Sequence, residues 1–226
     1  MALLKMNENH VGRAVLIVTV LFLAASALFF APVSIPHKLC FSVGLLTVAS
    51  LWLTPWEISL ALLFSVIGDY AGTCSNFMAQ MSSFAVAHVF YIIYFIRRFI
   101  RKEYRMTAKF KGYLFILAIC TGMLLVSVLV KVVPAVSAGV LRTGVCIYAV
   151  LICTMLYTAL MQRSSLYALG AIIFVVSDFI LAWNKFIEPV PYRNLLVLGT
   201  YFAAQWLIFI RSTPYRVPHP IHLMRF

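Results

Sequence analysis

Charged residues are scarce in this chain, and acidic residues are the scarcest of them. Only 11% of the 226 residues are charged, against about a quarter in soluble domains, and six acids stand beside eighteen Lys and Arg. Hydrophobic residues make up 64% of the chain. A water-soluble domain needs more polar side chains on its surface, so the composition excludes one and predicts an integral membrane protein.

Two further absences narrow the chemistry. The five cysteines are an odd number without a Cys-x-x-Cys pair, which argues against a disulfide framework or a zinc cluster. The chain also lacks a Gly-x-Ser-x-Gly nucleophile motif. His88 is the one histidine inside an apolar run, whereas zinc chemistry needs three or more ligands. We therefore expect no metal and no other cofactor.

Eight apolar segments dominate the rest of the sequence. They cover residues 14–30, 39–53, 58–72, 83–96, 112–133, 139–161, 166–183 and 195–210. The runs are apolar on every face, which favours helices over the strands of a closed barrel. The first run resembles a signal peptide, but seven more follow, so we interpret it as an uncleaved helix. The prediction is an all-α, polytopic membrane protein with eight transmembrane helices, forming a single domain over residues 1–226.

The basic residues are distributed unevenly between the loops. With the N-terminus inside, thirteen Lys and Arg fall on the inner side, and the outer five are Lys38, Lys131, Arg142, Lys185 and Arg193. The positive-inside rule then places both termini in the cytoplasm, as expected for a protein of a bacterial inner membrane. The most basic stretch, residues 97–111, resembles a nucleic-acid arm, but a loop between two membrane helices is already explained by topology and by anionic headgroups. We predict no nucleic-acid partner.

The only two aspartates, Asp69 and Asp178, both lie inside apolar segments. A carboxyl in the hydrocarbon region is costly, so it normally faces the bundle interior and marks chemistry or an ion path. At a rise of about 1.5 Å per residue, both lie about 18–20 Å from the inner ends of their helices. They therefore reach the same level in the outer half of the membrane, where they could meet. The alternative is a structural role, as neutral side chains bonded across helices.

Each aspartate segment is followed by a segment with further polar side chains. His88 and Tyr91 follow the first, and Tyr201 and Gln205 follow the second, at spacings that put each pair on one helix face. A lone His or Tyr in a membrane helix is more often a packing residue, but these four converge on the level of the aspartates. The correspondence also suggests a 4+4 internal repeat, whose halves would share one orientation.

Two carboxyls close together in a low dielectric cannot both ionise easily, so such a pair supplies an acid and a base. The pair can protonate an acid-labile group and stabilise the resulting cation, or orient a water molecule. A proton-coupled transporter of lipids or small molecules is the main alternative, because buried aspartates also serve as proton relays. Unbroken helices count against it, since many transporters place their sites on discontinuous helices. A structural or assembly protein is the third possibility.

The polar segments resemble the signatures of a known family, the YhhN-type membrane lysoplasmalogenases. The stretches LALLFSVIGDYAG, FAVAHVFYIIYF, GAIIFVVSDFILA and TYFAAQWLI are similar, in order, to its Gly-Asp, Ala-His-x-x-Tyr, Gly-Ala-x-x-Phe-x-x-Ser-Asp and Tyr-x-x-x-Gln-x-x-Ile signatures. The resemblance covers most of the chain after residue 55. It implies an eight-helix enzyme that hydrolyses the vinyl ether bond of lysoplasmalogens to a fatty aldehyde and glycerophosphocholine or glycerophosphoethanolamine.

The resemblance also assigns roles to residues. It implies that Asp69 and Asp178 are the catalytic pair and that the substrate-binding residues around them are His88, Tyr91, Ser177, Tyr201 and Gln205. The family often has Lys-Pro in the second helix where this chain has Lys38-Leu39, so Lys38 is a candidate headgroup ligand on weaker grounds. The implied partners are a lysophospholipid substrate and membrane lipids, and the sequence does not indicate an oligomeric state.

Vinyl ethers are labile to acid, because protonation on carbon gives an oxocarbenium ion that water captures. A neutral aspartate as proton donor beside an ionised aspartate suits this route. The outer cations are also on the same side as the aspartates, and we expect one or two of them to hold the substrate phosphate by charge-assisted hydrogen bonds. Those considered are Lys38, Arg142, Lys185 and Arg193.

Overall fold

The computed structural model describes residues 8–214, and this part of the chain is helical throughout. The helices are α1 Glu8–Phe30, α2 Leu39–Leu53, α3 Trp56–Thr73, α4 Phe77–Arg101, α5 Ala108–Lys131, the 3₁₀ turn η2 Val133–Ala135, α6 Val140–Leu160, α7 Ser165–Phe186 and α8 Arg193–Ser212. The all-α prediction is confirmed for these residues, and each predicted segment coincides with one α-helix. Three cations counted for the orientation, Lys5, Arg216 and Arg225, lie outside the described residues.

The largest difference from the predicted segments is at α4, which starts six residues earlier and ends five later. The Asn76 side chain caps its N-terminus by accepting a hydrogen bond of 3.0 Å from the Ala79 amide. At the other end Arg98 and Arg101 occupy the last turn, where cations are favoured by the helix dipole. Because these ends are polar, they do not belong to the apolar run from which the helix was predicted.

Six of the described helices are long and apolar enough to cross a membrane: α1, α4, α5, α6, α7 and α8. This makes the chain an integral membrane protein. Helix α2 has 15 residues and at about 1.5 Å per residue is shorter than a hydrocarbon core of about 30 Å. Helix α3, which carries Glu57 and Asp69, is not among these six. The eight-span count therefore stays a prediction for α2 and α3.

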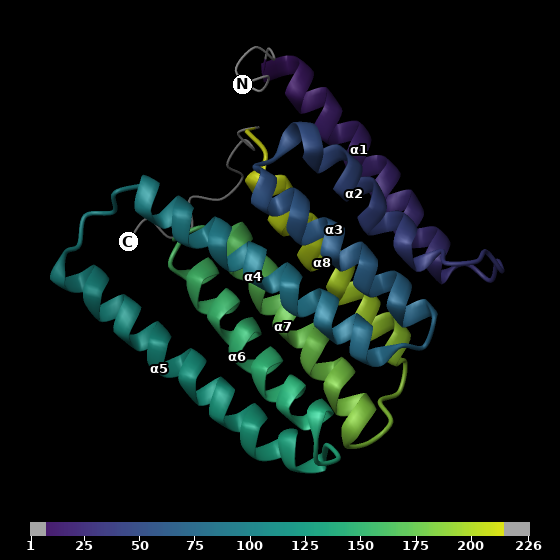
Figure 1. Ribbon diagram of the computed structural model, residues 1–226. Helices are drawn as coiled ribbons and strands as arrows, with labels where there is room; N and C mark the ends of the chain where they lie inside the picture. Colours follow the sequence, from purple (N-terminus) through teal and green to yellow (C-terminus); the bar gives the residue numbers. More distant parts are fainter. Residues whose placement is uncertain (1–7, 215–226) are drawn as a thin grey trace.

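The helices form a bundle whose edges and centre differ in burial. Figure 1 shows α1 and α5 at opposite edges, with α3, α4, α7 and α8 between them. Only Phe110 and Thr121 are buried in the 24 residues of α5, so most of this helix faces outward. The central helices supply the largest fully buried side chains, including Tyr91, Tyr167 and Phe174. Polar groups at the centre are therefore shielded from lipid by two flanking layers.

Helices α7 and α8 approach each other closely at Gly170. A Cβ atom on this residue would lie 3.0 Å from Ile208 Cγ1 and 3.3 Å from Leu207 Cβ. Small residues allow such approach between membrane helices, where packing rather than water drives association. This contact fixes α7, with Asp178, against α8, with Tyr201 and Gln205.

Candidate active site

Asp69 lies on α3 near the centre of the bundle and is 2% exposed. Its Oδ2 atom accepts a hydrogen bond of 3.0 Å from the hydroxyl of Tyr201 on α8. A buried carboxyl needs such a donor, because leaving it unpaired costs several kcal/mol. The bond therefore ties α3 to α8 at the level of the aspartate.

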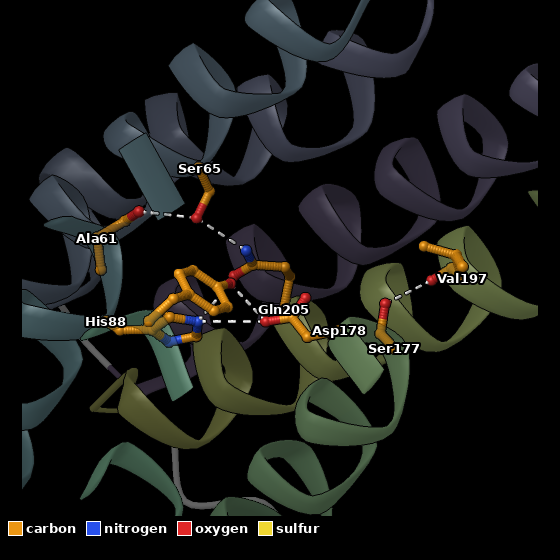
Figure 2. A network of polar contacts seen from close by, with 8 residues as sticks. Ala61, Ser65, His88, Ser177, Asp178, Val197 and Gln205 are labelled. Atoms are coloured by element: carbon orange, nitrogen blue, oxygen red, sulfur yellow. Dashed lines mark hydrogen bonds and ion pairs between the residues drawn. The ribbon is translucent and has the colours of Figure 1, made fainter. Parts of the chain in front are cut away.

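Asp178 lies on α7 and has two donors from other helices. Tyr148 on α6 donates its hydroxyl to Asp178 Oδ2 at 2.5 Å. His88 Nε2 on α4 lies 3.4 Å from the same oxygen and 3.0 Å from the Tyr148 hydroxyl oxygen. Figure 2 shows His88 pointing toward Asp178. Because the Tyr148 hydroxyl uses its hydrogen in the bond to Asp178, the hydrogen between Tyr148 and His88 must be on His88 Nε2. The buried Nδ1 of His88 has no hydrogen-bond partner among the described residues.

The two aspartates differ in the exposure of their carboxyl groups. The Asp178 side chain is 14% exposed, and its Oδ1 atom accepts no hydrogen bond from residues 8–214. Asp69 is almost completely enclosed. Asp178 Oδ1 is therefore a carboxyl oxygen that a bound molecule can contact from the cavity.

The pairing of carboxyls and donors crosses between the halves of the chain. His88 follows the Asp69 helix in sequence but contacts Asp178, and Tyr201 follows the Asp178 helix but contacts Asp69. These contacts bring His88 to Asp178 and Tyr201 to Asp69. The specific pairing was not predicted.

The two aspartates were predicted to meet, but no contact between their side chains is seen among the described residues. No hydrogen bond joins their carboxyls within residues 8–214, and the Phe174 ring lies between their surroundings. Its centroid is 5.0 Å from the ring centroid of His88 and 5.7 Å from that of Tyr201.

Gln205 connects three helices beside this site. Its Oε1 accepts a hydrogen bond of 2.5 Å from Tyr91, and its Nε2 donates to Ser65 Oγ at 2.9 Å. Ser65 in turn donates to the Ala61 carbonyl, as Figure 2 shows. All of these groups are buried. Tyr91 and Gln205 thus support the helices that carry the aspartates, and neither side chain is hydrogen-bonded to a carboxyl within residues 8–214.

Two predicted substrate-binding residues are engaged elsewhere. Ser177 donates to the Val197 carbonyl at 2.8 Å and joins α7 to α8 (Figure 2). The Lys38 ammonium donates to the carbonyls of Ala31 and Val33, both at 3.0 Å, and so closes the loop before α2. Both side chains hold the protein together in this structure.

An apolar cavity of about 80 Å³ adjoins Asp178. It lies between α4, α5, α6 and α7, and its walls include Met81, Leu124, Val145 and Phe186. Asp178 is the one charged residue that lines it, and Tyr148 and Gln80 are polar neighbours. A separate, open groove of about 620 Å³ contains Lys38 and Arg193.

Tyr148 was not predicted as a site residue from the sequence. It is one of eleven tyrosines and stands in α6 without another polar residue at helical spacing that would single it out. Separately, no three His, Cys, Asp or Glu side chains between residues 8 and 214 cluster as a metal site.

The fold and site together define a class: an integral membrane protein with carboxyl groups held inside its helical bundle next to an apolar cavity. A family model places the chain within that class. The model of the YhhN family matches residues 17–212, so the chain belongs to the YhhN family. The family resemblance predicted from the polar segments is confirmed.

Curated relatives carry the name lysoplasmalogenase. The human lysoplasmalogenase TMEM86B is 31% identical over 162 residues, which cover 70% of this chain and 64% of the human protein. The mouse lysoplasmalogenase TMEM86B is 28% identical over 175 residues, covering 77% and 71%. The bovine lysoplasmalogenase TMEM86A is 47% identical over 49 residues, covering 22% and 20%. The chain thus spans just under two thirds of the human relative, and no solved structure matches it.

The Gln205 contacts generate a prediction about stability. Gln205→Leu removes the acceptor of the buried Tyr91 hydroxyl, so the free energy of unfolding should fall by about 1–3 kcal/mol. Adding Tyr91→Phe removes the stranded hydroxyl and should restore part of the loss. Thermal unfolding in detergent measures both variants, with Thr200→Val as control, because Thr200 bonds only to carbonyls of its own helix. Equal stability of the single and double variants would contradict the bond.

Proposed function

We propose that this protein hydrolyses the vinyl ether bond of lysoplasmalogens to a fatty aldehyde and glycerophosphocholine or glycerophosphoethanolamine. The names of its relatives support the substrate class. The observation that carries the proposal is the free Oδ1 of Asp178 at the wall of an apolar cavity. Cleavage of a vinyl ether begins with a proton delivered to carbon, and this oxygen, beside a cavity that suits an apolar chain, is placed to deliver it.

The proposed reaction uses Asp178 as acid and then as base. Protonated Asp178 gives its proton to the vinyl carbon remote from the ether oxygen, and a lone pair of that oxygen completes the oxocarbenium ion. The carboxylate left behind stabilises this cation. Water adds to the carbon next to oxygen and returns a proton to Asp178. The hemiacetal then separates into the aldehyde and the glycerophospho alcohol.

The neighbours of Asp178 assist by position. Tyr148 and His88 both approach Oδ2, so Oδ1 is left to exchange the proton. Asp69 is hydrogen-bonded to Tyr201, whose ring packs against Phe174. Asp69 does not line the cavity and is not bonded to Asp178. We therefore assign the proton transfer to Asp178 and a positioning role to Asp69, in place of two equivalent catalytic carboxyls.

The cavity accommodates only the reacting part of the substrate. Its volume of about 80 Å³ is far below the roughly 300–1,000 Å³ of a complete ligand pocket. The alkenyl chain must therefore continue past the cavity wall, and α5, which contributes Leu124 and Val128 to that wall, faces outward over most of its length. The substrate chain then extends into surrounding lipid.

The outer cations are not equivalent as headgroup ligands. Lys185 lies with Nζ 5.2 Å from the ring centroid of Phe77, which lines the Asp178 cavity. Arg142 donates from Nε and Nη2 to the Val136 carbonyl, and Lys38 is bound to two carbonyls in a different groove. Lys185 is therefore the best-placed ligand for the substrate phosphate.

The finer topology belongs to the same proposal. We infer eight spans with both termini in the cytoplasm, from the excess of inner-side cations. The crossed contacts of α3 with α8 and of α7 with α4 support a 4+4 repeat, because a two-fold relation between halves would generate both.

The substrate assay tests the function itself. Purified protein should release aldehyde from alkenyl lysolipids and leave the ester analogues of the same chain length intact, because esters do not form the oxocarbenium ion on protonation at carbon. Aldehyde is measured by trapping with a hydrazine reagent. Proton-coupled uptake by vesicles without any aldehyde would favour the transporter instead.

Substitution of the two aspartates tests the division of roles. Asp178→Asn should lower kcat at least about 100-fold, because the amide cannot transfer the proton. Asp69→Asn should lower kcat less than about tenfold with KM unchanged, since its amide oxygen still accepts from Tyr201. Unfolding temperatures confirm that both variants are folded. Equal losses in both folded variants would restore an equivalent catalytic pair.

The headgroup assignment predicts a change in binding. Lys185→Ala should raise KM with little change in kcat, because a phosphate contact binds the substrate and the transition state equally. Lys131→Ala is the matched control, since Lys131 also lies in the last turn of a helix, whereas the contact with the Phe77 ring of the cavity wall belongs to Lys185. A wild-type KM in Lys185→Ala would exclude this ligand.

A further inference from the structure

A cluster of cations lies at the end of the bundle remote from the aspartates. Arg98 on α4 and Arg211 on α8 both stack on the ring of Tyr167, with their Cζ atoms 5.2 Å and 5.4 Å from its centroid. Tyr167 is fully buried, and its hydroxyl donates to the Arg211 carbonyl at 3.0 Å. One fixed ring therefore holds two guanidinium groups near each other.

Lys102 adds a third positive charge to this cluster. It follows Arg98 by one helical turn, directly after the end of α4. Burial lowers the pKa of Lys102, and the positive charges of Arg98 and Arg211 lower it further. The three cations are thus close enough to repel one another.

The loop after α4 passes through the same positive field. Burial raises the pKa of Tyr104, whereas the charges of Arg98, Arg163 and Arg211 act to lower it. The Tyr104 hydroxyl donates to a carbonyl of the α6–α7 connection at 2.7 Å, which fixes the loop against the cations. The cluster is therefore built from α4, α8 and two loops that are held in place.

No carboxylate between residues 8 and 214 pairs with Arg98, Lys102 or Arg211. The ion pair there is Arg97 with Glu57, and the carboxyl of Asp178 lies against His88 at the other end of the bundle. Glu103, the acid next in sequence to Lys102, is exposed and forms neither contact. The Nε atom of Arg98 is buried without a hydrogen-bond partner. This buried N–H donor of Arg98 lies among cations that repel one another, so a bound anion would both accept its hydrogen bond and reduce the repulsion.

We propose that Arg98, Lys102 and Arg211 bind the phosphate of an anionic phospholipid headgroup. Guanidinium groups match phosphate oxygens in geometry, and cationic pockets between membrane helices bind such headgroups. The flanking residues suit a lipid, because Ile100 is 67% exposed and Met106 is 50% exposed beside the cluster in sequence. The site lies at the opposite end of the bundle from Asp178 and is independent of the proposed reaction.

The test compares lipids on the full-length protein in detergent. Phosphatidylglycerol should raise the Tm by about 5 °C more than phosphatidylcholine with the same acyl chains. Lys102→Gln should lose most of this difference. Its Tm in phosphatidylcholine should equal or exceed that of the wild type, because the substitution relieves repulsion. Lys109→Gln, an exposed cation at the start of α5, should behave as the wild type.

Inorganic phosphate distinguishes the source of the bound anion. A shift with phosphatidylglycerol but not with millimolar phosphate supports the lipid headgroup, and native mass spectrometry should then show one retained phosphatidylglycerol. An equal shift with phosphate alone would replace the lipid by a soluble anion. Equal Tm values in the two lipids, or equal losses in Lys102→Gln and Lys109→Gln, would overturn the site. Arg98→Gln should repeat the Lys102→Gln result.

Discussion

The burial of two carboxyl groups in an apolar bundle is the constraint on which the rest of the structure depends. Each group needs a hydrogen-bond donor that does not itself require water. Tyr201 meets this need for Asp69, and Tyr148 with His88 meets it for Asp178. Tyrosine suits the task because its ring packs as a hydrocarbon while its hydroxyl serves the carboxyl.

The same donors determine which helices form the centre. The donors come from α4, α6 and α8, which pack with α3 and α7, whereas α1 and α5 supply no donor and lie at opposite edges (Figure 1). The Phe174 ring contacts both His88 and Tyr201, and the Gln205 contacts join α8 to α3 and α4. The site is consequently asymmetric, with one carboxyl enclosed and the other facing the cavity.

Much of this arrangement was predictable from the sequence, and the limits have physical causes. Helices were predictable because lipid requires long apolar runs, and 39–53 agrees with α2 at both ends. Asp69 and Asp178 stood out because carboxyls are rare there. The exchange of His88 and Tyr201 between them was not predictable, since depth and helix face do not determine which helices are neighbours. Tyr148 was missed because no spacing pattern marks a single tyrosine.

The central claim is that cleavage begins with proton transfer from the Asp178 site to a vinyl carbon. Hydrolysis of an alkenyl lysolipid in D₂O, with immediate reduction of the aldehyde to the alcohol, tests this most directly by mass spectrometry. The account predicts one deuterium on the carbon next to the former carbonyl, and in H₂¹⁸O no label in the glycerophospho product. An alcohol without deuterium at that carbon, or ¹⁸O in the glycerophospho product, would contradict this account.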